Sequence, residues 1–354
     1  MKNSFSNLII YYISGTGNAR KSAEWIVGVA KESGINTWLY KIDRTKRPEI
    51  PELPEGKTLI GFCHPTHGFN AAPKALHYIF RFPKIRGARA FVLNTRAGLK
   101  AWKLFIPGLS GLALILPAFV LLLKGYKIQA LKPVDLPSNW ISLHPGLNEK
   151  TVHLIYEHWK KNVQRFGEKI ISGKRIWRGL FSLPVDLLIS PIAVGYYFVG
   201  RFALSKSFIA TDACTSCGKC VKQCPVNAIR MHGKYPFWTH KCESCMRCMN
   251  NCPERAIETM HGMVIPLWYF AWSIAPPFIF TWLLRQSNVL SGLNHGWREV
   301  LYNIVWAFTF LLFSFTAYRL IHYMMRFRLF NKLVAYTSLT KYKFWRRYKA
   351  PEEY

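Results

Sequence analysis

Acidic residues are scarce in this sequence. Its 354 residues include 48 lysines and arginines but only 18 aspartates and glutamates, so the formal net charge is +30. A basic excess of this size indicates a polyanionic partner, and nucleic acid and an anionic membrane are the two usual candidates. The opening residues, 1–7, also lack the character of a secretory signal peptide, and we expect none there.

Charge of either sign is absent from two long apolar segments. Residues 263–284 and 300–318 contain no charged residue, and each is long enough to cross a bilayer. A short stretch, 285–299, joins them, and a tail rich in Lys and Arg follows. The sequence therefore predicts a transmembrane hairpin at 263–325 and a basic-aromatic tail at 326–354. It also favours a membrane with anionic lipids over nucleic acid as the partner.

The basic tail predicts the orientation of this hairpin. Segments rich in Lys and Arg stay on the cytoplasmic side of a membrane, which puts the tail in the cytoplasm. Two crossings return the chain to its starting side, so we expect the soluble domains and both termini on the cytoplasmic face of the inner membrane. Within the tail, residues 341–349 alternate bases with aromatic residues, and we expect them to be an interfacial anchor.

Cysteine is sparse outside one short region. Only Cys63 lies elsewhere, at the end of an expected strand, and we interpret it as a buried structural thiol. The other eight form two runs of the pattern C-x2-C-x2-C-x3-C-P, and the second run repeats the first 28 residues later (242 − 214 = 28). Four disulfides would suit a small secreted scaffold, and a zinc site pairs C-x2-C with a distant second pair, so neither explains the runs as well.

The double run resembles the pattern that holds [4Fe–4S] clusters in two-cluster bacterial ferredoxins. The resemblance implies that the fourth cysteine of each run binds the cluster of the other run. One cluster would then be held by Cys214, Cys217, Cys220 and Cys252, and the other by Cys242, Cys245, Cys248 and Cys224. We therefore expect two [4Fe–4S] clusters at 209–260, one-electron transfer and a reducing compartment.

The preceding part of the chain, 5–173, alternates strand-like and helical patterns. Apolar runs predict strands at 8–13, 37–42, 58–62, 88–93 and 126–131, and periodic patterns predict helices at 20–31, 72–80 and 148–172. This alternation indicates an α/β doubly wound parallel sheet, whose ligands lie beyond the carboxyl ends of the strands. The whole chain would then combine this sheet with an α+β ferredoxin domain and two transmembrane helices.

Three small or polar loops follow strands at that edge of the sheet. The first, Ser-Gly-Thr-Gly-Asn-Ala at 14–19, lies between a strand and a helix, where glycines and backbone amides can hold a phosphate. The other two loops are expected at 64–69 and 94–98. A mononucleotide would lie among the three.

The opening strand and its loop resemble flavodoxin. Over residues 5–260, the order of the elements, Lys124-Gly125, Pro137-Ser138-Asn139-Trp140 and the paired cysteine runs resemble a family of ferredoxins with an N-terminal flavodoxin-like domain. The resemblance implies FMN as a cofactor, with its phosphate on Ser14, Gly15, Thr16, Gly17, Asn18 and Ala19. Its ring would be flanked by Pro65, Thr66, His67, Gly68, Asn94, Thr95, Arg96, Ala97 and Gly98.

Two features depart from flavodoxin. Ala19 replaces a hydroxyl residue, and the ring loops carry His64, His67 and Arg96, where flavodoxins tend to be acidic. A basic site would stabilise a reduced, anionic flavin. Equally, the pocket could hold another ligand or none, and both alternatives stay open here.

Two further apolar segments do not belong to a soluble flavodoxin. Residues 104–123 connect two strands of one sheet, so we expect either a crossover helix packed on the sheet or one that also touches lipid. Residues 180–204 lie in the linker between the soluble domains, 174–208, and contain Asp186 and Arg201. They fit a surface-lying or re-entrant segment, with a buried linker helix as the alternative.

Together these features predict a membrane-anchored electron-transfer protein. Electrons would pass between FMN, two [4Fe–4S] clusters and a membrane-associated or soluble redox partner protein, with a quinone as another candidate. One alternative is a redox subunit or docking scaffold that has clusters but a degenerate flavin pocket. Another is a reductase that acts on a quinone or an isoprenoid lipid.

Overall fold

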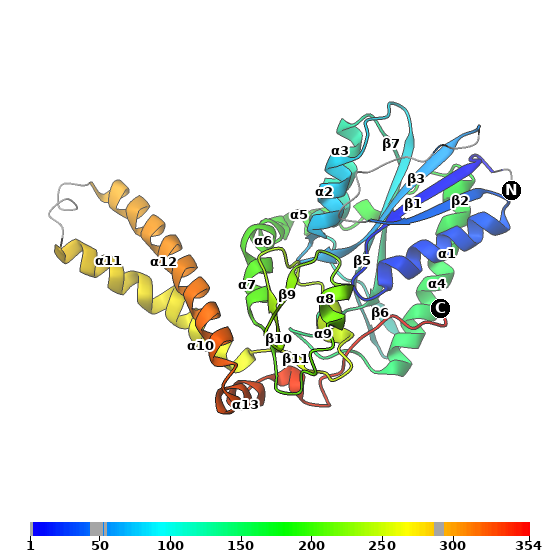
Figure 1. The fold of residues 1–354 in the computed structure, drawn as a ribbon. Coiled ribbons are helices and arrows are strands. Elements are labelled where there is room, and N and C mark those ends of the chain that lie inside the picture. Colours follow the sequence, from blue (N-terminus) through cyan, green and yellow to red (C-terminus); the bar gives the residue numbers. More distant parts are fainter. Residues whose placement is uncertain (1–2, 43–51, 53–54, 287–293) are drawn as a thin grey trace.

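The structure is a computed structural model that describes residues 3–42, 52, 55–286 and 294–354. It has three parts: an α/β domain, a small domain that contains both cysteine runs, and a helical hairpin that projects from them (Figure 1). This is the arrangement that the sequence predicts.

Five parallel strands form the central sheet of the α/β domain, in the order β2-β1-β3-β5-β7. They are β1 (Asn7–Tyr12), β2 (Asn36–Lys41), β3 (Thr58–His67), β5 (Arg89–Ala101) and β7 (Lys127–Pro137). The middle strands carry continuous apolar runs, 8–12 in β1 and 59–63 in β3, because both faces of the sheet are covered. This strand order is the flavodoxin-like doubly wound topology.

Two pairs of helices cover the sheet. On one face lie α1 (Asn18–Glu32) and α4 (Glu149–Ile171), and on the other lie α2 (Pro73–Arg81) and α3 (Leu112–Leu123). Alternate residues of β1 serve the two cores: Leu8 and Ile10 pack toward α1 and α4, whereas Ile9 and Tyr11 pack toward α2 and α3. The strand order reverses between β1 and β3, and the loop at 14–19 lies beyond the carboxyl ends of the strands at this point.

Two strands are longer than predicted. β3 continues to His67 and turns back into β4 (Asn70–Ala71), and β5 continues to Ala101 and turns back into β6 (Leu104–Ile106). The expected loop at 94–98 is therefore wrong, because these residues pair with β7, as in Thr95 with Val134. Residues 104–123 likewise do not form one crossover helix: β6 comes first, and α3 begins only after Gly111.

The small domain consists of two antiparallel strand pairs and two short helices. They are β8 (Phe208–Ala210) with β11 (Ile257–Thr259), β9 (Ile229–His232) with β10 (Tyr235–Trp238), α8 (Lys219–Gln223) and α9 (Arg247–Asn250). Its core residues, including Trp238 and Met249, belong to the same apolar cluster as the α1–α4 face of the sheet. The two soluble domains are thus packed against each other.

Short helices on the surface connect these domains. They are η1 (Arg178–Leu180), α5 (Leu183–Leu188), α6 (Ser190–Gly195), η2 (Tyr196–Gly200) and α7 (Arg201–Lys206). The buried Asp186 carboxylate accepts hydrogen bonds from the backbone N–H groups of Ser110 and Gly111, just before α3. Meanwhile Phe181 and Leu188 are 95% and 79% exposed. The linker was expected to be either a surface-lying segment or a buried helix. Its exposed side chains fit a surface-lying segment, which Asp186 anchors to the soluble domain.

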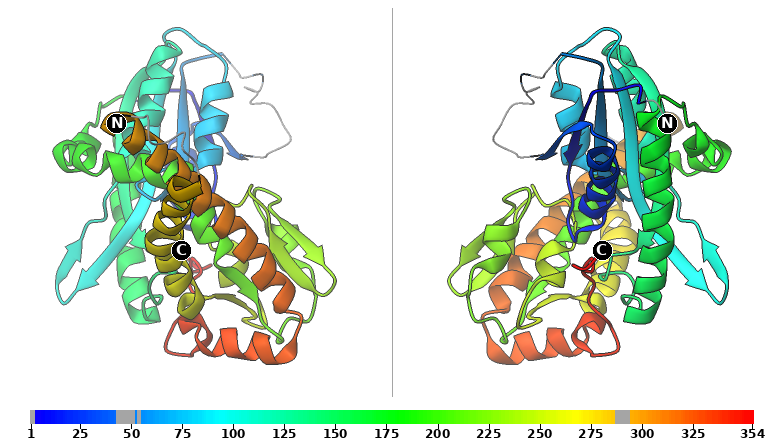
Figure 2. Two further views of the ribbon diagram at one scale, coloured as in Figure 1. Left: turned by 90° about the vertical axis from the view of Figure 1, so that its left-hand side faces the viewer. Right: turned by 90° about the vertical axis from the view of Figure 1, so that its right-hand side faces the viewer.

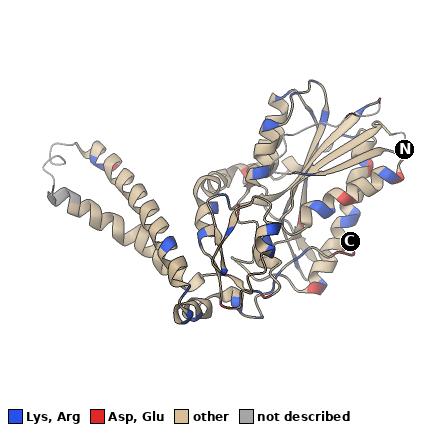
Figure 3. Ribbon diagram, viewed as in Figure 1, with Lys and Arg blue, Asp and Glu red and all other residues tan. Residues whose placement is uncertain are grey.

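The hairpin consists of two long apolar helical segments. The first comprises α10 (His261–Tyr269), η3 (Phe270–Ile274) and α11 (Ala275–Gln286), and the second is α12 (His295–Met324). Both are long and apolar enough to cross a membrane. Figure 3 shows almost no charged residue along the hairpin, whereas Lys and Arg are spread over the soluble part. The predicted connection at 285–299 lies partly within these helices, and 287–293 are outside the described residues.

The C-terminal tail folds back over the soluble domains (Figure 2). After α13 (Arg328–Tyr336) and η5 (Leu339–Lys341), the Trp345 and Tyr348 side chains are only 8% and 3% exposed, within the apolar core. Arg347 pairs with Glu258 at 3.1 Å. The expectation that residues 341–349 form an interfacial anchor is therefore wrong for Trp345 and Tyr348, because they are buried in protein.

Candidate metal centre

The cysteine repeat is also a repeat of backbone conformation. Residues Ser216, Gly218 and Asn227 have left-handed φ angles of 59°, 68° and 44°, and 28 positions later Ser244, Met246 and Arg255 have 52°, 57° and 49°. Left-handed turns curl the chain so that successive N–H groups point into one concavity, which suits an anionic group. The two cysteine loops thus share one conformation built for the same kind of ligand.

Four thiols from both runs surround one cavity. Cys214, Cys217 and Cys220 from the first run and Cys252 from the second line it, and we call this site one. The structure thus brings together the four cysteines that the sequence assigns to one cluster. In the described part of the chain, no group of three or more His, Cys, Asp or Glu could hold a metal ion on its own. Four cysteine thiolates around one cavity are the ligand set that a [4Fe–4S] cluster takes.

The remaining cysteines gather in a second place, which we call site two. Cys242 and Cys248 lie within electrostatic range of Cys245 and of Cys224, which comes from the first run. Backbone amides donate to the sulfurs of both crossing cysteines, from Ala228 to Cys224 (3.1 Å) and from Ala256 to Cys252 (3.3 Å). Such hydrogen bonds stabilise thiolate ligands and tune cluster potentials.

The two sites differ in their exposure to solvent. In site one Cys217 is exposed, whereas in site two Cys242 is buried. Burial raises the pKa of the Cys220 thiol to about 11 and that of Cys245 to about 12. Without iron these thiols are protonated at neutral pH, so metal binding must release their protons.

The α/β domain covers site two with its phosphate loop. A Cβ atom on Gly15 would lie 2.8 Å from the Cys245 carbonyl oxygen, so only glycine permits this approach. Asn139 and Trp140, at the end of β7, donate hydrogen bonds to the carbonyls of Cys245 (3.3 Å) and Ser244 (3.2 Å). The edge of the sheet where a mononucleotide was expected is therefore in contact with the small domain.

Several polar atoms of the predicted phosphate loop already form hydrogen bonds with other protein groups. The Gly17 amide donates to Ser14 Oγ (3.0 Å), and Thr16 Oγ1 accepts from Asn139 (2.9 Å). Asn18 Oδ1 accepts from the hydroxyls of two tyrosines, Tyr156 and Tyr348. Ala19 is fully buried.

The C-terminal tail lies directly on this loop. The Ala350 amide donates to the Thr16 carbonyl (3.0 Å), and a Cβ atom on Gly17 would lie 2.4 Å from the Ala350 methyl carbon.

The predicted ring site is covered as well. A Cβ atom on Gly68 would lie 2.0 Å from the Tyr196 ring, and Tyr196 in turn packs on Trp140, with ring centroids 5.3 Å apart. Asn94 donates to Thr66 Oγ1 (2.7 Å).

The other residues predicted to flank the flavin ring are buried in the protein or pair within strands. Arg96 pairs with Asp135. His67 and Thr95 are buried, Pro65 forms part of β3, and Ala97 and Gly98 pair with β7.

Tyr196 and the pairing of β5 with β7 thus occupy much of the predicted ring site in this arrangement. At the same place His64 Nε2, both ring nitrogens of His67 and Asn94 Oδ1 are buried without a hydrogen-bond partner among the described residues, so polar groups for a ligand are present. What persists is a polar cavity of about 240 Å³ beside the phosphate loop, lined by Ser14, Gly15, Thr16 and Gly17 together with Arg20 and Arg247. Its two arginines suit it to a small anion.

The sequence did not indicate that Tyr196 covers the predicted ring site or that Ala350 covers the predicted phosphate loop. Tyr196 was hidden in an apolar linker, and Ala350 lies at the end of a tail assigned to lipid. The burial of Trp345 and Tyr348 left no periodic signal either, because the tail is not helical there. Contacts between residues more than a hundred positions apart leave no local pattern in a single sequence.

Comparisons with known proteins agree with the small domain and describe the sheet only in outline. Residues 213–257 match the family model of a 4Fe-4S dicluster domain. No curated protein matches the chain. The chain therefore combines an iron–sulfur dicluster domain with a flavodoxin-like sheet and two long apolar helices.

Among solved structures, a flavodoxin from the domain Archaea is similar, at 14% identity and a TM-score of 0.27, over 46% of this chain and 99% of that protein. A mutant flavo di-iron protein from Thermotoga maritima (18%, 0.27) and the flavodiiron protein from Giardia intestinalis (15%, 0.26) are similar over 45% and 46% of this chain. The chain spans just over a third of those two proteins, 36% and 37%.

Proposed function

We propose that this chain is a membrane-attached electron carrier that uses two [4Fe–4S] clusters. The observation that carries the proposal is the pair of cysteine sets, of which one contains the exposed Cys217 and the other the buried Cys242, within electrostatic range of Tyr318 on α12. Electrons would enter or leave at site one through a soluble redox partner protein and pass to site two. From there they would reach an acceptor or donor in the membrane.

In this proposal the flavodoxin-like domain is mainly a scaffold. Its phosphate loop and the end of β7 cover site two and exclude water from it, which protects a buried cluster and affects its potential. The second candidate, an FMN-loaded protein, is favoured by the polar cavity beside Ser14 to Gly17. FMN would then require Tyr196 and the C-terminal tail to move.

Membrane attachment and its orientation belong to the same proposal. The hairpin would cross the inner membrane twice, with the soluble domains and the tail in the cytoplasm among anionic lipids. The basic excess supports this orientation, because Lys and Arg are frequent in the soluble part and in α13 but almost absent from the hairpin.

One experiment tests the proposal and separates its two forms. The full chain is purified anaerobically in detergent, and iron, acid-labile sulfide and flavin are quantified beside EPR of the reduced protein. We expect about eight irons and two interacting centres, as in two-cluster ferredoxins, with substoichiometric flavin. Zinc in place of iron would refute the proposal, whereas stoichiometric FMN would refute its scaffold form alone.

A further inference from the structure

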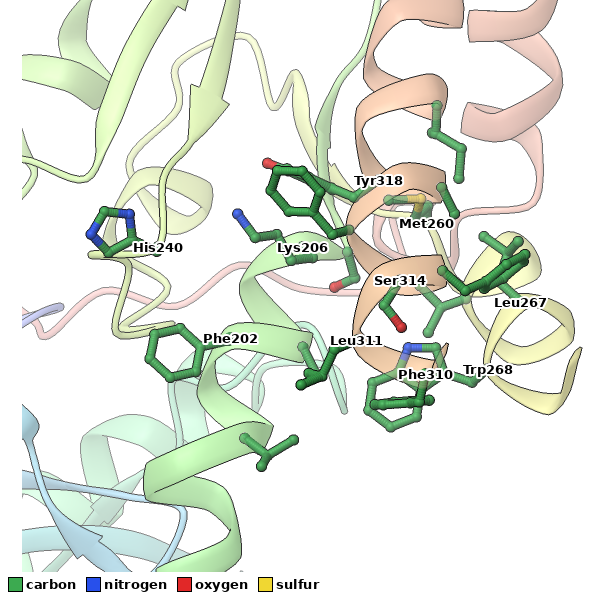
Figure 4. A pocket seen from close by; sticks show the side chains of 18 of the residues that line it. Phe202, Lys206, His240, Met260, Leu267, Trp268, Phe310, Leu311, Ser314 and Tyr318 are labelled. Carbon is green, nitrogen blue, oxygen red and sulfur yellow. The ribbon is translucent and has the colours of Figure 1, made fainter. Parts of the chain in front are cut away.

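An apolar cavity lies where the hairpin meets the small domain. Its volume is about 360 Å³, near the lower end of small-ligand pockets, which span about 300–1,000 Å³. Helices α7, α10 and α12 supply its walls, through side chains such as Phe202, Leu267, Trp268, Phe310 and Leu311 (Figure 4). It is therefore formed jointly by the soluble linker and both arms of the hairpin.

The polar groups of this cavity include Lys206 and Tyr318. The Lys206 ammonium and the Tyr318 hydroxyl both donate to the Trp238 carbonyl, at 3.2 and 2.9 Å. Lys206 Nζ lies 4.3 Å from the centre of the Tyr318 ring, so it is held between protein groups and not in bulk water. An ammonium has three donors and a hydroxyl can also accept, so both retain hydrogen-bonding capacity for a ligand.

This polar part of the cavity adjoins site two. Lys206 and Tyr318 each lie within electrostatic range of Cys242. His240, another lining residue, is two positions before Cys242 in the chain. A head group bound beside Lys206 and Tyr318 would therefore lie at the side of the cavity that faces site two.

The cavity also lies at the depth of a membrane surface. Tyr318 ends the charge-free run of α12, 300–318, and Arg319 follows it. Ser314 and Leu311 lie about one and two turns from Tyr318 toward the N-terminus of α12, within the apolar run. Trp268 on the facing arm is an aromatic residue of the kind that concentrates at membrane interfaces. A lipid-soluble molecule could therefore enter sideways from the bilayer.

We propose that this cavity binds a quinone with an isoprenoid tail and that site two exchanges electrons with it. The inference rests on the proposed function and names its membrane partner. A quinone has a carbonyl acceptor for the Lys206 ammonium and a flat apolar ring and tail for the aromatic walls. The Tyr318 hydroxyl, whose proton goes to the Trp238 carbonyl, can accept a hydrogen bond from the quinol once it forms. A phospholipid fits less well, because its charged head belongs in water, whereas the polar groups here face inward toward Cys242.

The chemical step balances with the two clusters alone as reductant. Each reduced cluster, [4Fe–4S]⁺, gives one electron and becomes [4Fe–4S]²⁺. The two electrons and two protons from water convert the quinone carbonyls to hydroxyls, so two O–H bonds form and the ring becomes aromatic. Electrons would reach the clusters from the soluble partner at site one.

The test uses the full chain in lipid nanodiscs under anaerobic conditions. The clusters are reduced with dithionite, the excess is removed by gel filtration, and decylubiquinone is added. We expect the visible absorbance of the oxidised clusters to return and one quinol to form for every two electrons. Cytochrome c, a water-soluble one-electron acceptor, is run in parallel.

Two tryptophan variants on α12 locate the reaction. Ala317 lines the cavity, and Ala317→Trp should slow reoxidation by the quinone at least about tenfold, because the indole takes up space that the quinone would occupy. Ala307 is exposed on the same helix and lines no part of this cavity, so Ala307→Trp should behave as the wild type. Leu311→Trp, at a half-exposed wall position, is a second filling variant if Ala317→Trp loses iron.

The outcomes separate this inference from the proposed function. Equal rates in the wild type and in the filling variants would overturn the quinone site. So would reoxidation by cytochrome c without reoxidation by decylubiquinone, which would leave the electron carrier standing and make the cavity a lipid contact. Wild type without clusters would instead refute the proposed function itself.

Discussion

Cys224 is the residue that most directly distinguishes crossed from uncrossed cluster ligation. If it serves site two, Cys224→Ala should remove that cluster and leave site one, so iron and sulfide should fall by about half. Iron analysis and EPR should then show one magnetically isolated centre that still reacts with cytochrome c, since site one contains the exposed Cys217.

The matched control for this variant is Cys63→Ala. Cys63 is buried in β3, outside both cysteine runs, and its loss should leave iron unchanged. A surviving centre that is closed to solvent would mean that Cys224 serves its own run.

The histidines at the end of β3 predict a pH dependence of stability. Burial lowers the pKa of His64 and of His67 to about 4, whereas an unfolded chain has a histidine pKa of about 6.5. Between these values the unfolded state binds protons that the folded state does not. The free energy of unfolding should therefore fall as the pH drops from 6.5 toward 4, by at most roughly 3 kcal/mol per histidine.

This dependence can be measured by denaturant unfolding of the full chain in detergent between pH 7 and 5. His67→Gln should make the slope against pH shallower, because it removes one of the two groups. The exposed His77, on α2, serves as the control, and His77→Gln should leave the slope unchanged. Equal slopes in all three proteins would contradict a buried, neutral His67.

At the scale of elements, the parts with a strong local pattern were predictable. The bounds of β1 and α4 lie within two residues of the expected ones. β1 is buried on both faces and shows a continuous apolar run, whereas α4 is buried on one face and shows an apolar stripe. The extension of β5 was not predictable, since the β7 residues that pair with it come some forty positions later. The hairpin with β6 was missed too, because residues 104–106 begin the apolar run that was expected to be helical. Tyr196 and Ala350 were missed as well, since their positions over the expected flavin site depend on distant contacts.

The C-terminal tail is an element whose attachment depends on few groups. The Tyr348 hydroxyl bonds Asn18 and Tyr156 in the interior, and its amide donates to Asn250 of the small domain. Tyr348→Phe removes only the hydroxyl and should cost about 1–2 kcal/mol, because buried partners lose a hydrogen bond. Thermal unfolding and protease sensitivity of the tail would report this loss.

Tyr336 offers a matched control for the tail. It is 68% exposed on α13, and Tyr336→Phe should change neither the unfolding temperature nor the cleavage of the tail. A Tyr348→Phe protein that is as stable as the wild type would mean that the tail is held by Trp345 and Arg347 instead.

At the scale of the whole molecule, the features line up as one route for electrons. Site one contains the exposed Cys217, the loop at 14–19 contacts site two at Cys245, and the apolar cavity lies where the small domain meets the hairpin. Two basic residues lie near site one: Lys219 lines its cavity together with Glu254, and Lys234 is within electrostatic range of Cys214. They would favour an acidic soluble partner and speed its association at low salt.

The tail and the hairpin together fix what a topology experiment should find. Because Ala350 bonds Thr16 and Arg347 bonds Glu258, the tail must lie on the same side of the membrane as both soluble domains. The charge-free run of α12 covers about 19 residues, or roughly 29 Å as a helix, which matches the hydrocarbon core of a bilayer.

Reporter fusions after Tyr354 and at Asn294 should therefore lie on opposite sides, with Tyr354 in the cytoplasm. Both reporters in the cytoplasm would show that the hairpin does not cross. Tyr354 outside with Asn294 inside would keep the hairpin but reverse the proposed orientation, and the soluble redox partner would then have to be sought outside the cytoplasm.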